Sequence, residues 1–213
     1  MPNWNGERLS LGPEAGAGHL QLHLTRYVFA LKFCEGQRVV DVGCGTGYGT
    51  WLLAQVALAV LGFDCCEEAI EEGRRRYAES NLTYVCRTLE SFADSTEDRF
   101  DRVVAFESIE HWADMEAGLA LVRDNLLAAG GLLVASVPLN AGTNKWHHYR
   151  GLNAAQWLEL IGSFFSIRRL WFQPIGNELE HIGNTGIEQA APEELMAHDQ
   201  GNILFLAEHR REA

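Results

Sequence analysis

The sequence predicts an α/β fold, in which a mainly parallel sheet has helices on both faces and an antiparallel closing strand. From Arg38 onward, short runs of β-branched residues alternate with stretches of helical spacing, which is typical of βαβ units. A glycine-rich turn follows the first of these runs, where open parallel sheets bind their ligands. The 213 residues are 47% hydrophobic, which is enough for one well-buried core.

The elements can be placed in chain order from their spacing and their end signals. Apolar residues at helical spacing predict a first helix over residues 15–33, laid on the domain. Seven strands are expected, at residues 38–42, 58–63, 82–86, 100–106, 132–137, 167–172 and 203–208. Further helices are expected at residues 48–55, 67–79, 114–127 and 153–161, and Gly130 and Gly131 should stop the third of these. The last two strands should pair as the hairpin that closes the sheet.

Charge and composition argue against several classes of protein. The formal net charge is -12 with only 17 Lys plus Arg, so a phosphate backbone would be repelled at long range and a nucleic-acid partner is disfavoured. The first ten residues have no basic cluster before an apolar run, and the most apolar stretch, residues 56–63, is too short to span a bilayer. We therefore expect a soluble, cytoplasmic protein with no membrane partner.

The number and positions of the five cysteines also favour a cytoplasmic protein. Their number is odd, they lie in apolar or strand-like contexts, and the sequence has no CxxC pair or histidines spaced for zinc. This pattern favours a reducing environment. The adjacent Cys65 and Cys66 have two interpretations, a redox-active pair or small residues that begin a helix after a strand, and we favour the second.

The turn after the first strand has the spacing of a nucleoside-binding loop. Asp41, Gly43, Gly45 and Gly47 give D-x-G-x-G-x-G, whereas a dinucleotide fingerprint would need its third glycine where Tyr48 stands. The spacing therefore points away from NAD. Glycines let the backbone approach a ligand closely, and the helix that follows offers free N–H groups.

An acidic residue stands at the end of the second strand. Asp64 comes nineteen residues after Gly45, close to the roughly 20 expected for an acid that binds a ribose. Its carboxylate can accept protons from both ribose hydroxyls. The turn and the acid together are much stronger evidence than the turn alone.

Between about Gln37 and Val137 these residues resemble the class I S-adenosylmethionine-dependent methyltransferases, of the type 11 and type 12 kind. The resemblance implies a Rossmann-like, seven-stranded sheet and S-adenosylmethionine as cofactor. It further implies that the glycine loop holds the methionine and ribose part, while the acid after the second strand binds ribose. The residues matched to these roles are Asp41, Gly43, Cys44, Gly45, Gly47, Asp64 and Cys65.

The resemblance extends to the adenine and methionine ends of the cofactor. The family has an acid near the adenine, but this sequence has Thr88 there, so Leu89 is expected to supply a backbone N–H and an apolar wall. Glu107 ends the fourth strand beside the cofactor. In the first helix, Arg26 and Tyr27 belong to an H-x-x-R-Y segment like one that covers the cofactor in related enzymes. An exposed helix face with a half-buried Tyr27 is the alternative, and we favour the cofactor role.

No second block of composition marks another domain, so residues 1–213 are expected to form a single methyltransferase domain. Residues 1–36 would form an N-terminal helical cap and residues 37–137 the cofactor-binding core. Residues 138–213 would form the acceptor side. The long polar connection 173–202 is expected to be a partly ordered lid.

Methyl transfer to a hydroxyl needs a group that removes the hydroxyl proton. His111 lies just past the fourth strand and is the first candidate base, with helix packing or capping as the alternative role. His147 and His148, in the run KWHHYR, are candidates for base or substrate contact. An inverted zincin motif H-x-x-E-H would need His where Glu107 stands, so we expect no metal.

The acceptor class follows from absent motifs and from charge. The place after the fourth strand reads AFESIE, which lacks both the D/N-P-P-Y/F turn and the Pro-Cys nucleophile of enzymes that methylate nucleic acid bases. We therefore expect a small-molecule acceptor with a hydroxyl group, a sugar or a secondary metabolite. N-methylation, a non-catalytic cofactor-binding domain and a nucleotide-dependent oxidoreductase are the alternatives. Oligomeric state stays open, with a homodimer as one option.

Overall fold

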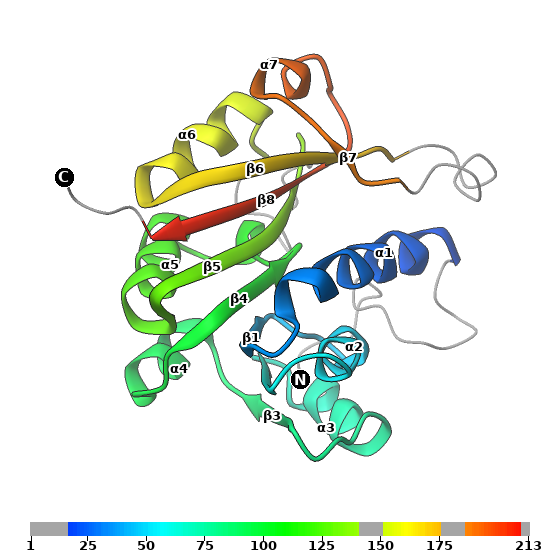
Figure 1. Cartoon of the computed structure of the whole chain (residues 1–213), viewed down its shortest axis with the longest axis vertical. Coiled ribbons are helices and arrows are strands. Elements are labelled where there is room, and N and C mark those ends of the chain that lie inside the picture. The colour runs from blue at the N-terminus through cyan, green and yellow to red at the C-terminus, as the bar shows by residue number, and fades with distance from the viewer. Residues whose placement is uncertain (1–16, 141–150, 176–185, 210–213) are drawn as a thin grey trace.

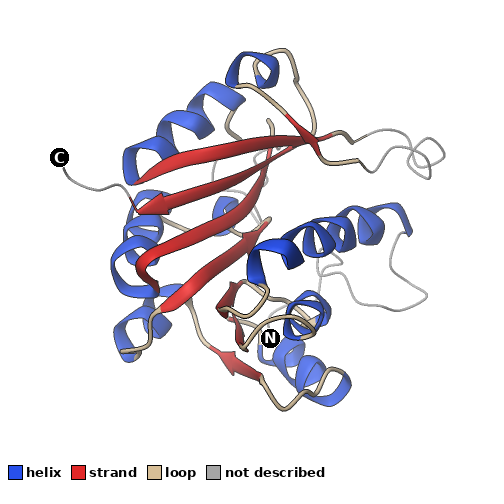
Figure 2. Cartoon of the chain, viewed as in Figure 1, coloured by secondary structure: helices blue, strands red, loops and turns tan. Residues whose placement is uncertain are grey.

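A computed structural model describes residues 17–140, 151–175 and 186–209. Within these ranges it has one eight-stranded sheet of order β3-β2-β1-β4-β5-β8-β6-β7, shown in Figures 1 and 2. The strands are β1 (Arg38–Val42), β2 (Ala59–Asp64), β3 (Leu82–Cys86), β4 (Phe100–Phe106), β5 (Leu127–Pro138), β6 (Phe165–Gln173), β7 (Glu188–Gln189) and β8 (Asn202–His209). The mainly parallel sheet with an antiparallel closing strand is confirmed.

The order of the strands reverses at β1. β1 pairs in parallel with β2 on one side and with β4 on the other, so the chain changes direction across the sheet between them. β8 runs antiparallel between β5 and β6 and completes the predicted hairpin. In open sheets of this kind, ligands bind outside the carboxyl ends of the strands at such a reversal. The carboxyl ends of β1 and β4 are therefore the expected place for a site.

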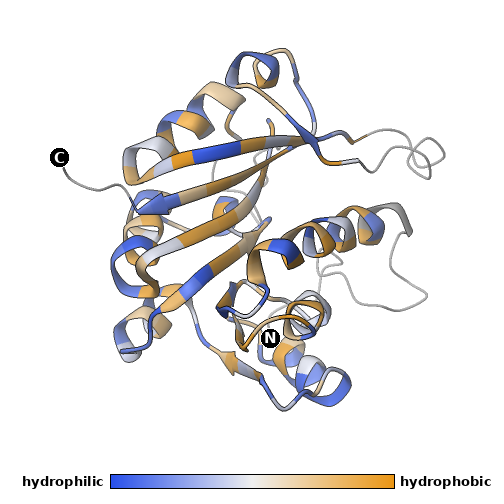
Figure 3. Ribbon diagram, viewed as in Figure 1, coloured by the Kyte–Doolittle hydropathy of each residue, from blue (hydrophilic) through white to orange (hydrophobic). Residues whose placement is uncertain are grey.

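Helices cover both faces of the sheet. In Figure 1, α1 (Ala17–Cys34), α2 (Tyr48–Ala54) and α3 (Glu67–Arg76) lie on one face, and α4 (Leu89–Ser95), α5 (Met115–Leu121) and α6 (Ala154–Phe164) on the other. Each layer has its own buried apolar cluster against the sheet. Figure 3 shows the corresponding pattern, with strands mostly hydrophobic and helices hydrophilic on part of their surface.

Local end signals explain several helix boundaries. Asn153 and Gln156 form a reciprocal capping box at the start of α6, each side chain bonded to the other's backbone N–H at 3.0 Å. The Asp114 carboxylate accepts from the backbone N–H of Ala117 at 2.9 Å and so caps α5. Cys66 is the N-cap residue of α3, in agreement with the second interpretation of the cysteine pair.

The structure corrects the prediction after β4. The expected helix 114–127 ends as α-helix at Leu121, continues as a π-helix over Val122–Leu126, and gives way to β5 at Leu127. Gly130 and Gly131 therefore lie inside a strand and do not stop a helix. Gly130 has a φ of 78°, and the pairing of β5 with β4 shifts register at this place, so the glycines allow an irregularity in the strand.

Three further elements, α4, β7 and α7 (Pro192–Leu195), were not expected from the sequence. α4 is a two-turn helix too short to show a clear period, and Thr88 caps it. β7 makes the sheet eight-stranded, and it lies with the short helix α7 in the connection 173–202. α3 also ends at Arg76 instead of Glu79. No helix in the described ranges is both long and apolar enough to cross a membrane.

Candidate cofactor-binding and active site

The glycine-rich turn between β1 and α2 is crowded by neighbouring segments. Gly43, Gly45 and Gly47 have φ values of 72°, 55° and 83°, in the left-handed region. A Cβ on Gly43 would lie 2.8 Å from the Cβ of Ser108, and one on Gly47 would lie 2.6 Å from the ring of Tyr84. Glycine is therefore required at both ends of the turn, which presents bare backbone at the edge of the sheet.

Asp64 joins this turn to the next one. Its carboxylate accepts a hydrogen bond from the backbone N–H of Gly45 at 3.1 Å and another from the N–H of Cys66 at 2.9 Å. The side chain thus lies between the turns that follow β1 and β2. An ionised carboxylate has about four lone-pair sites, so it can accept several hydrogen bonds at once.

Asp41 supports the turn from beneath. Its side chain is 0% exposed and accepts from Thr50 Oγ1 at 2.7 Å and from Tyr27 Oη at 3.2 Å. Burial raises the pKa of this carboxyl to about 7, although the hydrogen bonds from Thr50 and Tyr27 act in the opposite direction. Asp41 and Tyr27 therefore bind α1, β1 and α2 together, and direct contact of either with a cofactor stays a prediction.

The ring of Tyr27 packs directly on the backbone of Gly49, so a residue with a side chain does not fit at position 49. A Cβ on Gly49 would lie 2.1 Å from the Tyr27 ring. The ring also makes edge contacts with Tyr48 at 5.8 Å and with Phe106 at 5.2 Å between centroids. The alternative of a half-buried Tyr27 on an exposed helix face is therefore wrong, because the side chain is buried against α2 and β4.

The two cysteines among the predicted residues differ in position. Cys44 is buried beneath the turn, where burial raises the pKa of its thiol. Cys65 is exposed at the end of β2. Only Cys65 therefore has an exposed side chain on the ribose side of the site.

Arg26 and Glu107 form a buried pair above the ends of β4 and β5. The guanidinium is 2% exposed, and its Nη1 lies 3.6 Å from Oε1 of Glu107. Ser136 Oγ donates to the same Glu107 oxygen at 2.6 Å. Glu107 itself has a φ of 50°, an uncommon value for a residue with a side chain, and such strain gathers at functional sites.

The segment after β4 continues with three polar residues of different exposure. Ser108 and Glu110 are buried, and Ser108 Oγ and Glu110 Oε2 have no hydrogen-bond partner among the described residues. Burial, followed by the neighbouring Glu107 carboxylate, raises the pKa of Glu110 well above its usual range. His111 is exposed and is the last residue of a 3₁₀-helix, Ile109–His111.

Thr88 and Leu89 lie at the start of α4, one turn beyond β3. The Thr88 hydroxyl accepts from the backbone N–H of Ser91 at 3.2 Å, which explains a threonine at this position through capping. Leu89 is buried against the sheet. The hydroxyl of Thr88 is thus engaged within the helix, and adenine recognition by this pair stays a prediction.

His147 and His148 lie outside the described residues, as do residues 176–185 of the connection 173–202. In the ranges that the structure does describe, no group of three His, Cys, Asp or Glu side chains is arranged to hold a metal ion. The expectation that no metal is required stays a prediction.

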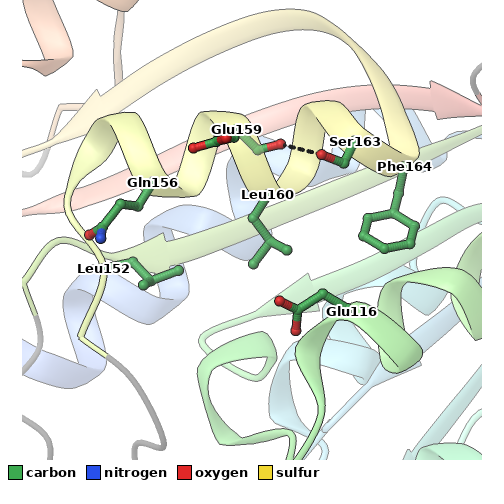
Figure 4. A pocket seen from close by; sticks show the side chains of 7 residues that line it. All are labelled: Glu116, Leu152, Gln156, Glu159, Leu160, Ser163 and Phe164. Carbon is green, nitrogen blue, oxygen red and sulfur yellow. Dashed lines mark hydrogen bonds between the residues drawn. The ribbon is translucent and has the colours of Figure 1, made fainter.

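A hollow of about 380 Å³ lies elsewhere, between α5 and α6. Figure 4 shows the side chains around it, including the carboxylates of Glu116 and Glu159 and the ring of Phe164. No residue of the glycine turn, β2 or β4 lines it. This hollow is therefore separate from the site at the carboxyl ends of β1 and β4.

Sequence reasoning missed two amides that the fold places against Arg26. Gln173 Oε1 accepts from Arg26 Nε at 2.6 Å. Asn202, in the amide orientation that satisfies its neighbours, accepts from Arg26 Nη2 at 2.6 Å and donates to Glu107 at 3.0 Å. The sequence held a weak signal, because both are polar residues at the ends of apolar strands that flank the long connection.

Comparisons with known proteins agree with this site. A family model described as a methyltransferase domain matches residues 39–131, which include the glycine turn, Asp64 and Glu107. A ubiquinone biosynthesis O-methyltransferase of Chelativorans sp. is 32% identical over 117 residues, covering 54% of this chain and 46% of that protein. A probable S-adenosylmethionine-dependent methyltransferase of Mycolicibacterium smegmatis is 32% identical over 135 residues, covering 60% and 51%. The chain thus spans about half the length of these curated relatives.

Solved structures share the fold along nearly the whole chain. The N-methyltransferase NodS of Bradyrhizobium japonicum WM9, in complex with S-adenosyl-L-homocysteine, has a TM-score of 0.66 at 20% identity, covering 99% of this chain and 94% of that one. The [4+2]-cyclase SpnF also has a TM-score of 0.66, at 18% identity, covering 100% and 87%. The matched family model, the glycine turn, the acid after β2 and the strand order lead to one conclusion: residues 39–131 form a methyltransferase domain, and the chain has the fold of the class I methyltransferases.

Proposed function

We propose that this protein transfers the methyl group of S-adenosylmethionine to a hydroxyl group of a small molecule, a sugar or a secondary metabolite. The observation that carries the proposal is the position of Asp64. Its carboxylate is held by backbone N–H groups of two turns at the carboxyl edge of the sheet. A carboxylate so placed can accept hydrogen bonds from both hydroxyls of an adenosine ribose.

Two further features support this cofactor. A Cβ on Gly45 would meet nothing within 4 Å, so the backbone at the middle of the turn is open to the close approach of a ligand. Nη1 of Arg26 is a buried cationic donor without a hydrogen-bond partner among the described residues. A guanidinium N–H bonds strongly to a carboxylate, and the methionine part of the cofactor has one. The residues fit S-adenosylmethionine, with Thr88 and Leu89 assigned to the adenine end.

When bound, the cofactor supplies an electrophilic methyl group on a positively charged sulfur. The contribution of the protein is mainly alignment, which can provide roughly 7 to 11 kcal/mol of rate enhancement. Tyr27 and Thr50 fix Asp41 beneath the turn and so fix the turn itself. Glu107 provides negative charge beside the predicted sulfonium position, and Ser136 holds that carboxylate.

A hydroxyl acceptor must lose its proton during transfer, and we assign this step to a histidine base. His111 is exposed where the chain leaves β4, within the edge that holds the turn and Glu107. A positioned histidine typically adds 10²- to 10⁴-fold to the rate near neutral pH. His147 and His148 are the alternative bases.

The names of the curated relatives and the net charge of this chain support a small-molecule acceptor. The curated relatives include ubiquinone biosynthesis O-methyltransferases, in which the methyl acceptor is an oxygen. The net charge of -12 disfavours nucleic acid. N-methylation is the second candidate, because the N-methyltransferase NodS has a similar fold. Since the cyclase SpnF shares that fold, a non-catalytic or differently reactive cofactor-binding protein is the third.

We further propose that residues 1–213 act as one functional unit. α1 bonds to Asp41 in the core through Tyr27 and to Gln173 on the acceptor side through Arg26. Residues 1–36 would then cap the cofactor, and the connection 173–202 would close over the acceptor. In the described part of this connection, Leu195 is fully buried, which supports a lid with an ordered base.

Calorimetry and an acceptor panel test the proposal. Titration with S-adenosylmethionine, S-adenosylhomocysteine and NAD should give binding of the first two and none of the third. Incubation with S-adenosylmethionine and a panel of phenols, catechols, sugars and amines, followed by mass spectrometry, should give products one methyl group heavier on oxygen. Binding of NAD alone would overturn the cofactor assignment. Methylation of amines alone would replace the hydroxyl acceptor by a nitrogen, and binding without any product would favour the non-catalytic alternative.

A further inference from the structure

Arg26 is held by two amides from strands β6 and β8 of the sheet. Its Nε donates to Oε1 of Gln173 at 2.6 Å, and its Nη2 donates to the oxygen of Asn202 at 2.6 Å. Its Nη1 is 3.6 Å from Glu107 and has no hydrogen-bond partner among the described residues. We call Arg26, Glu107, Gln173 and Asn202 the Arg26 cluster. One nitrogen of the guanidinium is thus left for a ligand, and the other two are occupied.

Each amide also binds a second element of the fold. Gln173 Nε2 donates to the backbone oxygen of Leu22 in α1 at 3.2 Å, and the nitrogen of Asn202 donates to Oε2 of Glu107 at 3.0 Å. Gln173 is 0% and Asn202 is 1% exposed. Buried amides with both ends satisfied hold their neighbours in one geometry, because any rotation leaves a polar group unpaired.

The geometry prevents a bidentate pair between the two charges of the cluster. An arginine and a carboxylate in contact usually form such a pair, which uses two guanidinium nitrogens. Here Asn202 lies between Arg26 Nη2 and Glu107 Oε2, and Ser136 Oγ donates to Oε1 of Glu107 at 2.6 Å. Because these partners fill the sites of the bidentate pair, Arg26 and Glu107 make one ion pair at 3.6 Å, without a direct hydrogen bond.

The two amides also mark the base of the connection over the acceptor side. Gln173 is the last residue of β6 and Asn202 the first of β8, and they are Cα partners in the ladder. The connection 173–202 therefore begins and ends at the pair of residues that holds Arg26. A change in the position of Gln173 or Asn202 would therefore move the Arg26 guanidinium. Likewise, a ligand bound to Arg26 would stabilise one position of the two amides by the same free energy.

We infer that Gln173 and Asn202 are positioning residues for the cofactor: they prevent a bidentate pair of Arg26 with Glu107 and so leave Nη1 without a hydrogen bond, to bind the methionine carboxylate. The inference rests on the proposed function, since it assigns Arg26 to that carboxylate. It goes further by linking cofactor affinity to the two residues where the connection 173–202 begins and ends. Without the amides, Arg26 forms a bidentate pair with Glu107 and loses affinity for the ligand.

The test measures binding of S-adenosylhomocysteine by calorimetry, so it does not depend on the acceptor. Gln173→Met removes the oxygen that accepts from Arg26 Nε at nearly constant volume. Asn202→Leu and the smaller Asn202→Ser remove the spacer between the two charges. Each should raise the Kd at least about tenfold, the usual effect of losing a hydrogen bond to a charged group.

Asn81→Leu is the matched control for the loss of a structural amide. Asn81 donates to the backbone oxygens of Ala54 at 2.9 Å and of Ala57 at 3.0 Å, close to the amino ends of β2 and β3 and away from the Arg26 cluster. We expect this variant to lower the Tm as the cluster variants do while leaving the Kd unchanged. If the cluster variants lower only the Tm, as Asn81→Leu does, Gln173 and Asn202 are structural and the inference is overturned.

A double-mutant comparison tests the spacer role directly. In an Asn202→Ser background, Arg26 can form a bidentate pair with Glu107, but it cannot form that ion pair when Glu107→Gln is also present. The fold-change caused by Asn202→Ser should therefore be smaller in the Glu107→Gln protein than in the parent. Equal fold-changes in both backgrounds contradict the spacer role. Failure of the parent protein to bind S-adenosylhomocysteine would instead overturn the proposed function itself, so the two failures are distinguishable.

Discussion

Replacing Asp41 by Asn tests the balance of burial and hydrogen bonding beneath the glycine turn. The carboxyl is fully buried, and Thr50 and Tyr27 both donate to it. Burial favours the neutral acid, whereas the two donors favour the anion. The raised pKa, about 7, means that burial prevails. Asn preserves the shape and an acceptor oxygen but does not ionise.

The magnitude follows from the difference between the folded and unfolded pKa. A pKa of about 7 in the folded protein stands roughly three units above the ordinary value of about 3.9 in an unfolded chain. Three units correspond to roughly 4 kcal/mol. Because the folded value is the higher one, this stability is fully present below about pH 4 and is lost as the pH rises toward about 7. The free energy of unfolding of Asp41→Asn, minus that of the parent, should therefore increase by roughly 4 kcal/mol from pH 4 to pH 8.

Urea unfolding followed by tryptophan fluorescence gives the required free energies, since the chain has six Trp residues. Curves for the parent and for Asp41→Asn at pH 5, 6, 7 and 8 yield the difference at each pH, and other titrating groups cancel in it. Asp94→Asn, which removes an exposed carboxylate from α4, controls for the loss of one negative charge. A difference that does not change with pH would refute the reasoning. If instead the parent becomes more stable relative to the variant as the pH rises, the hydrogen bonds from Thr50 and Tyr27 outweigh the effect of burial on the pKa of Asp41.

Three other changes probe the site. Asp64→Ala should raise the Kd for S-adenosylhomocysteine by roughly 100-fold in calorimetry, since two ligand hydrogen bonds to a charged group are lost, and an unchanged Kd would contradict ribose binding. His111→Ala should lower kcat by about 10²- to 10⁴-fold with little change in cofactor Kd, and an unaltered kcat would exclude His111 as the base. Gly49→Ala should cost roughly 1 to 3 kcal/mol in urea unfolding, because its Cβ would lie 2.1 Å from the Tyr27 ring, and parent-like stability would show that the ring has room to move.

Much of the fold follows from the sequence because its strongest signals are local. The run from Arg38 to Val42 and the glycine turn after it place β1 and α2, and Asp64 follows from its distance to the turn. Asn153 predicts the start of α6 by capping. These signals depend on a few neighbouring residues, so they do not need the rest of the structure.

Two local signals were misleading for a physical reason. A glycine pair usually ends a helix, but Gly130 and Gly131 lie where β5 must bend to pair with β4. α4 has only seven residues and is fixed by Thr88 at its cap and by buried Phe92 against the sheet, so its short sequence shows no clear period. In both cases, pairing or packing with distant residues decided the conformation.

The partners of Arg26 depend entirely on the fold. Gln173 is 147 residues away from Arg26 in the chain, and Asn202 is farther still. Their side chains meet only because β8 lies between β5 and β6 and α1 packs on one face of that sheet. Sequence reasoning found Arg26 and Glu107 through a family resemblance, whereas its signal for the two amides, polar residues at the ends of apolar strands, was too weak to assign them to Arg26.

The distribution of buried polar groups argues that this edge of the sheet serves a ligand and not stability alone. The buried polar and charged residues of the described chain all lie at or beside it: Arg26, Asp41, Thr46, Thr50, Asp64, Ser108, Glu110, Ser136, Gln173 and Asn202. Replacing a buried ion pair by apolar residues is often neutral or stabilising, so a chain selected only for stability has no need of these groups. Arg26 Nη1, Ser108 Oγ and Glu110 Oε2 even lack partners among the described residues, and each such group costs about 1 to 3 kcal/mol. A bound cofactor and acceptor would satisfy them, so ligand binding should stabilise this edge more than any other part of the fold.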